Sequence, residues 1–101
     1  MSLEEYRAEL DVIDKTLEEY FVRRMKTVEK IGAYKRANGI PTLDAGREKA
    51  VLEKHTKDIE PELAPYMEEF FKAMMAISRK YQDEKRKNGP KEQASEDLCE
   101  N

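Results

Sequence analysis

The sequence is poor in the residue types on which most enzyme chemistry depends. Among 101 residues it has one histidine, His55, one cysteine, Cys99, and no tryptophan. A single cysteine forms no disulfide within the chain, and His55 has no second histidine or cysteine at the spacing of a metal site. The glycine-rich motifs of nucleotide sites and the serine motif of a nucleophile elbow do not occur either. We therefore expect no metal, no cofactor and no covalent nucleophile, and we interpret His55 as an ordinary helix residue.

Long hydrophobic runs are also absent. Charged residues make up 41% of the chain against 39% hydrophobic, and the net charge is -3. No segment approaches the roughly 20 apolar residues of a membrane helix, and residues 1–5 lack the basic and apolar parts of a signal peptide. The acidic balance gives no reason to expect nucleic acid, and no basic block indicates a membrane surface. We expect a cytoplasmic protein.

Residues 3–38 contain no proline and a single glycine, and they carry the clearest pattern in the chain. Apolar side chains recur there at steps of three and four, which is typical of one amphipathic helix. Ser2 and Glu5 have the form of a capping box, and residues 39–41 supply a stop. At about 1.5 Å per residue the helix would be about 50 Å long, which exceeds the width of a compact domain of this size. A helix of this length needs a partner along its length.

Two further helices are expected after a turn at residues 39–43. Asp44 is a plausible N-cap for a short helix over residues 45–58, and a proline-containing connection leads to a third helix whose apolar stripe ends near Tyr81. From Asp83 the pattern dissolves, and no segment reads as a strand. We predict an all-α fold with one very long, one short and one medium helix. We place the domain at residues 1–85 and expect a polar, disordered tail or linker at residues 86–101, where Cys99 would be an incidental exposed thiol.

Two cations interrupt the apolar face of the long helix. Arg24 and Lys35 are eleven residues apart, which is close to three turns, so both lie on one face and could converge on a small anion. Arg23 is adjacent, but the register that includes Leu17 favours Arg24. Arg7 precedes Arg24 by seventeen residues, or about 25 Å, so only an antiparallel second copy could bring it to the same place. The alternative is that these cations are solvated or pair with neighbouring glutamates.

Several short segments occur in a specific order along the chain. They are residues 7–14 (R-A-E-L-D-V-I-D), 24–25, 31–35, 39–41 and 44–48, followed by Ser78 and Gln82 in the third helix. In this order they resemble the all-helical class of chorismate mutases, also called type II, over about residues 3–82. The resemblance implies a homodimer of three-helix subunits, intertwined through the long helix, with two active sites.

The resemblance also implies a reaction and a set of site residues. Chorismate would be converted to prephenate by a pericyclic, Claisen-type rearrangement in phenylalanine and tyrosine biosynthesis, without a cofactor. Arg24 and, from the other subunit, Arg7 would bind the two substrate carboxylates, and Lys35 and Gln82 would donate hydrogen bonds to the ether oxygen. The remaining implied contacts are Glu48 and the N–H of Asp44 at the ring hydroxyl, Arg47 and Ser78 in support, and Ile31, Val51 and Met75 as an apolar wall.

Two other functions are considered. An isochorismate-pyruvate lyase has the same helical fold and nearly the same cations, but that branch tends to have an apolar residue at the position of Glu48. A non-catalytic helical dimerisation module would explain the long helix. It would not explain why Arg24 and Lys35 interrupt an apolar face in a chain that also carries Glu48 and Gln82.

Overall fold

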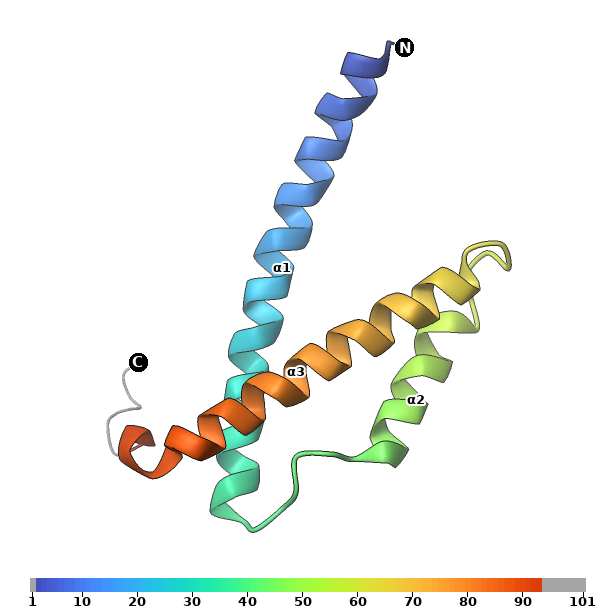
Figure 1. Ribbon diagram of the computed structural model, residues 1–101. Helices are drawn as coiled ribbons and strands as arrows, with labels where there is room; N and C mark the ends of the chain where they lie inside the picture. Colours follow the sequence, from blue (N-terminus) through green and yellow to red (C-terminus); the bar gives the residue numbers. More distant parts are fainter. Residues whose placement is uncertain (1, 94–101) are drawn as a thin grey trace.

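The computed structural model describes residues 2–93, which form three α-helices. They are α1, Leu3–Ala37, α2, Ala45–Thr56, and α3, Ala64–Gln93 (Figure 1). No strand occurs within this range. The predicted all-α fold with three helices and a long first helix is therefore confirmed.

The ends of α1 are set by local hydrogen bonds. The Glu5 N–H donates to the Ser2 hydroxyl at 3.2 Å, and the Ser2 N–H donates to the Glu5 carboxylate at 2.7 Å, which completes the capping box. At the other end Gly39 has a φ of 67°, in the left-handed region that favours glycine. The Ile40 N–H then donates to the Lys35 carbonyl at 2.8 Å and closes the helix.

The second helix begins where the sequence predicts, and the third extends further than expected. The Asp44 carboxylate accepts the Arg47 N–H at 2.9 Å as the N-cap of α2. Helix α3 has 30 residues and continues through residues 86–93, where we expected a disordered tail. That segment lacks an apolar period, but it begins with good helix formers, and Arg86 has partners in the loop before α2. Residues 94–101, with Cys99, lie outside the described residues, and the domain boundary at residue 85 stays a prediction.

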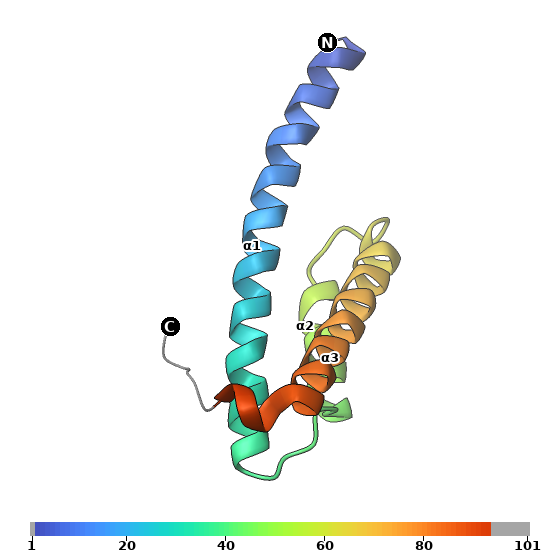
Figure 2. The same ribbon diagram turned by 60° about the vertical axis from the view of Figure 1, so that its left-hand side comes forward.

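Helix α3 contacts both other helices. In Figures 1 and 2 it crosses the C-terminal part of α1, and α2 lies beside its N-terminal half. The N-terminal half of α1 projects away from both. The chain measures 53 × 29 × 18 Å and has a radius of gyration of 17.2 Å, against about 13 Å for a compact domain of this length. The long dimension is therefore that of α1.

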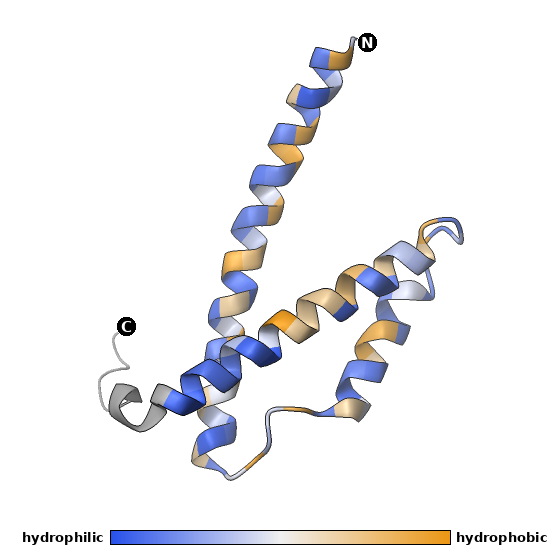
Figure 3. Ribbon diagram, in the orientation of Figure 1, coloured by the Kyte–Doolittle hydropathy of each residue, from blue (hydrophilic) through white to orange (hydrophobic). Residues whose placement is uncertain are grey.

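The buried core is small and lies at the helix crossing. Val28 and Met75 are its buried apolar residues, and the polar side chains of Ser78 and Gln82 are buried beside them. The apolar stripe of α1 is largely uncovered and is visible along the projecting half in Figure 3. Its members Leu3, Tyr6, Leu10, Ile13, Leu17 and Tyr20 are 50–62% exposed.

The surface area of the chain is also larger than expected for a compact monomer. The chain exposes 7847 Å², against about 5,900 Å² for a compact monomer of this mass. This extended shape agrees with the prediction that α1 needs a partner along its length.

None of the three helices, over the described residues, combines the length and apolar character that a membrane crossing requires.

Candidate active site

Arg24 and Ser78 join α1 to α3 where the two helices cross. Arg24 Nη1 donates to Ser78 Oγ at 2.9 Å, and Ser78 Oγ donates to the Met74 carbonyl at 2.9 Å. A guanidinium has several further N–H groups, so Arg24 is fixed in place while keeping donors available. Arg23, in contrast, is exposed and lies over the Tyr20 ring, with 4.8 Å between its Cζ and the ring centroid. Of these two arginines, Arg24 is therefore the one that faces α3.

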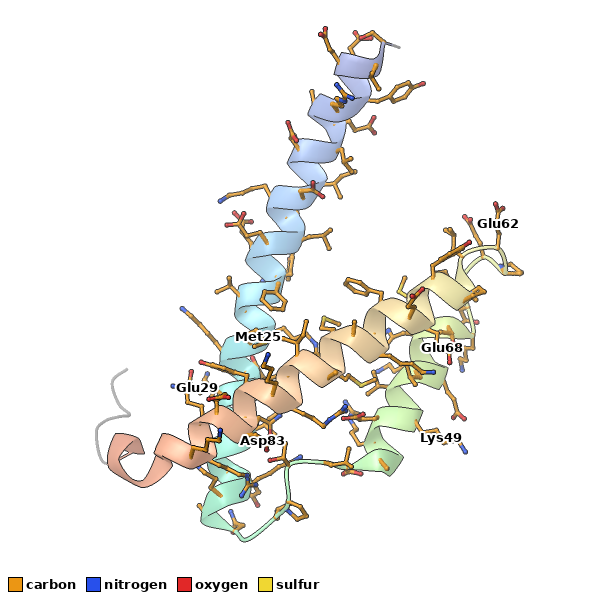
Figure 4. The ribbon with its side chains drawn as sticks, viewed as in Figure 1. Met25, Glu29, Lys49, Glu62, Glu68 and Asp83 are labelled. Carbon is orange, nitrogen blue, oxygen red and sulfur yellow. The ribbon has the colours of Figure 1, made fainter. Side chains whose placement is uncertain are left out.

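A second cluster holds the same crossing. The Tyr81 hydroxyl donates to the Glu29 carboxylate at 3.3 Å, and Lys85 Nζ lies 3.1 Å from the other carboxylate oxygen. Figure 4 shows Met25 and Glu29 on the part of α1 that α3 crosses, with Asp83 on the adjoining part of α3. These contacts fix the angle at which α3 passes the candidate site.

Gln82 packs directly against Gly32. It is 8% exposed, and a Cβ added to Gly32 would lie 3.2 Å from Gln82 Cγ and 3.7 Å from Oε1. A Cβ at position 32 would therefore require the Gln82 side chain to shift by a few tenths of an ångström. Gln82 Oε1 is enclosed and has no hydrogen-bond partner among the described residues. An unpaired buried oxygen costs about 1–3 kcal/mol, so this oxygen is available to accept a hydrogen bond from a water or a ligand.

Lys35 lies one turn beyond Gly32 on α1, so it is on the side of the helix that faces Gln82. It is half-buried, and its Nζ donates to the Thr42 carbonyl at 2.9 Å. Two N–H groups of the ammonium stay available for a ligand. Arg86 also contacts this loop, donating to the Thr42 hydroxyl at 2.9 Å and to the Ile40 carbonyl at 2.6 Å.

Glu48 is held by an arginine that sequence reasoning missed. Arg79 Nη1 lies 2.5 and 2.6 Å from the two carboxylate oxygens of Glu48, and both side chains are partly buried. Arg79 is three residues before Gln82, which places it one turn away on the same face of α3. The residue spacing on α3 could have indicated this face, but the pairing with α2 required the fold.

The remaining predicted residues take different positions. Asp44 caps α2, and the side chain of Arg47 is exposed. Arg7 is exposed on the projecting half of α1, away from the crossing. Of the predicted apolar wall, Met75 is buried, Val51 is half-buried and Ile31 is 46% exposed. One chain therefore brings together Arg24, Lys35, Ser78 and Gln82 along the crossing, with Glu48 tied to the same face of α3, and leaves Arg7 outside.

A groove of about 670 Å³ adjoins this cluster and shares Arg24 with it. Its walls are mainly apolar, formed by residues such as Leu17 and Phe21 of α1 and Phe70 of α3. His55 completes one wall by stacking on Phe71, with 4.6 Å between ring centroids and 3° between the planes. His55 is therefore part of the groove and not of the polar cluster. Residues 2–93 contain no group of three or more histidine, cysteine, aspartate or glutamate side chains that could hold a metal ion.

A family model described as chorismate mutase type II matches residues 6–83. The match spans every site residue that the sequence predicted, from Arg7 to Gln82, and covers more than half of the chain. Neither the curated proteins nor the solved structures gave a match.

Proposed function

The chain belongs to the chorismate mutase type II family, and from this premise we propose that it rearranges chorismate to prephenate. The observation that supports this most directly is the environment of Gln82. A neutral amide side chain is buried against Gly32, and Lys35 lies one turn further along α1. A site that offers neutral and cationic donors, without a nucleophile, suits a reaction that needs only positioning and charge stabilisation.

The proposed rearrangement takes place within one substrate molecule. The ether C–O bond breaks while a C–C bond forms, and the electron pairs move in a ring, so no proton, nucleophile or cofactor is required. Negative charge grows on the ether oxygen as its bond breaks. Lys35 Nζ and the Gln82 amide would donate to that oxygen, and one preorganised donor of this kind is worth about 3–4 kcal/mol of barrier.

The other polar residues would hold the substrate in its reactive form. Arg24, fixed by Ser78, would bind one carboxylate, because a guanidinium matches a carboxylate with two parallel hydrogen bonds. Glu48 would accept a hydrogen bond from the ring hydroxyl of the substrate. Each oxygen of its carboxylate has two lone pairs, and Arg79 uses only one of them. The N–H of Asp44 would assist there. Arg47 would support a carboxylate.

We further propose that the working form is a homodimer. A second copy of α1, running antiparallel, would cover the exposed apolar stripe and fill the groove beside Arg24. The excess surface of one chain is about 1,900 Å² by the same scaling, so two chains could bury about 3,800 Å² together, which is in the range of obligate homodimer interfaces. Such a copy would also deliver its Arg7 to the second substrate carboxylate, which a single chain leaves without a partner.

The first test is turnover of chorismate by the purified chain. Loss of chorismate absorbance should be accompanied by prephenate, identified by its conversion to phenylpyruvate in acid. Lys35→Ala should lower kcat about a hundred- to thousandfold while the helical content and oligomeric state stay unchanged. A folded chain that leaves chorismate untouched would overturn the proposal, and isochorismate would then be assayed for lyase activity. The chain would be interpreted as a non-catalytic helical module if it converts neither substrate and if the double variant Arg24→Ala/Lys35→Ala is at least as stable as the parent chain.

A further inference from the structure

The loop between α1 and α2 is held by a residue from the far part of α3. Arg86 donates from Nε to the Thr42 hydroxyl at 2.9 Å and from Nη2 to the Ile40 carbonyl at 2.6 Å. Lys35 donates to the carbonyl of the same threonine at 2.9 Å. Thr42 therefore lies between the guanidinium of Arg86 and the ammonium proposed to contact the ether oxygen. Arg86 lies in the segment where the sequence pattern predicted disorder.

Little else fixes this part of the loop. Ile40 and Leu43 are 39% and 54% exposed, so burial of apolar side chains does not anchor it. Pro41 has no N–H to donate, and the last bond that closes α1 reaches only Ile40. Over residues 2–93, the hydrogen bonds that reach Thr42 come from Arg86 and Lys35. Removing Arg86 would leave Thr42 bonded to Lys35 alone among these residues, so the carbonyl and the flexible lysine side chain could move together.

The position of that carbonyl matters because lysine is a flexible donor. A lysine ammonium at the end of its four-carbon stem samples many positions unless a partner restricts it. The Thr42 carbonyl restricts Lys35 through one N–H and leaves the other two available. A donor that is held before the reaction stabilises the transition state without a reorganisation cost during it.

We propose that Arg86 is a positioning residue, which holds Thr42 so that its carbonyl orients the Lys35 ammonium toward the ether oxygen of the substrate. Arg86 acts through the loop and does not contact substrate. The inference rests on the proposed mutase function, because only that function gives Lys35 its role. It goes beyond that function in assigning a task to the C-terminal part of α3.

The experiment compares Arg86→Ala with Lys87→Ala, which removes a neighbouring exposed cation of the same helix. We expect Arg86→Ala to lower kcat roughly ten- to hundredfold, as small misplacements of a catalytic group do, with KM changed less than about threefold. Amide hydrogen exchange at residues 40–44 should become faster in the same variant. Lys87→Ala should match the parent chain in both measurements.

A double substitution separates positioning from a general loss of structure. In a Lys35→Ala background, Arg86→Ala should lower the residual kcat less than about twofold, because no ammonium remains to be oriented. Thr42→Val removes the hydroxyl acceptor and keeps the carbonyl, so it should give a smaller loss than Arg86→Ala. It also provides the test if Arg86→Ala fails to fold.

The other outcomes would contradict the proposal or the function on which it rests. Faster loop exchange with unchanged kcat, or equal losses with and without Lys35, would overturn the positioning role. Unchanged loop exchange in Arg86→Ala would show that Arg86 does not hold the loop. If the parent chain does not turn over chorismate, the proposed function fails and removes the role of Lys35, whereas the exchange measurement still decides whether Arg86 fixes the loop.

Discussion

In the proposed mechanism, Gln82 is a neutral side chain at the ether oxygen, where negative charge develops. Its amide group is a hydrogen-bond donor at any pH, whereas a carboxyl group in that place donates only while it is protonated. The close packing of Gly32 limits how far the amide can move. The donor set at the ether oxygen therefore includes one group that does not titrate.

We predict that kcat for chorismate is nearly constant from pH 5 to 8. Replacing Gln82→Glu should make kcat fall about tenfold per pH unit above the pKa of the introduced carboxyl group, because the deprotonated form cannot donate. The measurement is a pH profile of both chains, with circular dichroism at each pH to verify that they stay folded. Gln82→Ala serves as the control and should be slow at every pH. A steep fall between pH 5 and 8 in the parent chain would contradict the role of Gln82.

Arg79 illustrates a contact that fixes a site residue from another helix. We predict that Arg79→Ala lowers kcat/KM about tenfold, because the Glu48 carboxylate loses the partner that orients it toward the ring hydroxyl. The loss should shrink in a Glu48→Gln background, where there is no ion pair to lose. Lys80→Ala, one residue further along α3 and exposed, is the matched control. Equal losses in both backgrounds would mean that Arg79 acts independently of Glu48.

At the scale of the helices, the close approach of α1 to α3 depends on one glycine. We predict that Gly32→Ala leaves the free energy of unfolding within about 1 kcal/mol of the parent chain, because gained helix propensity offsets the crowding of Gln82. Turnover should nevertheless fall, since the added methyl group displaces the Gln82 amide. Denaturant unfolding and steady-state kinetics test the two parts.

Gly46→Ala provides the control for this substitution. The added Cβ there would lie 3.7 Å from the Asp44 carboxylate, an ordinary contact. It should therefore show the propensity gain without crowding at the crossing. Unchanged turnover in Gly32→Ala would mean that the Gln82 amide tolerates displacement or has no part in the reaction.

Some features of the helices could be predicted from the sequence, and others could not. The capping box at Ser2 and the N-cap at Asp44 involve residues three apart, so the start of α1 and of α2 could be predicted locally. The full length of α3 could not, because its C-terminal part has no apolar period and Arg86 contacts a loop more than 40 residues earlier. Arg24 and Lys35 were found from helical register. Arg79 and Arg86 were missed because their partners lie on other elements.

At the scale of the whole molecule, the proposed site is incomplete in one chain. The crossing supplies a guanidinium at Arg24 and donors at Lys35 and Gln82, but the projecting half of α1 carries Arg7 away from them (Figure 1). The same half exposes the apolar stripe. A second copy that covers the stripe would also complete the site, so folding, assembly and activity would depend on one interface.

This dependence can be tested by mixing two inactive variants. We predict that Arg7→Ala and Arg24→Ala are each strongly impaired, because every site in either homodimer lacks one carboxylate partner. In a mixed dimer, one site receives Arg24 from the Arg7→Ala chain and Arg7 from the other chain, so it is intact. Random pairing makes half of the dimers mixed, and about a quarter of the parent turnover per chain should return. Co-expression or joint refolding ensures that the chains exchange. Two copies of Arg24→Ala treated alike are the control, and no recovery in verified mixed dimers would mean that Arg7 does not complete the partner's site.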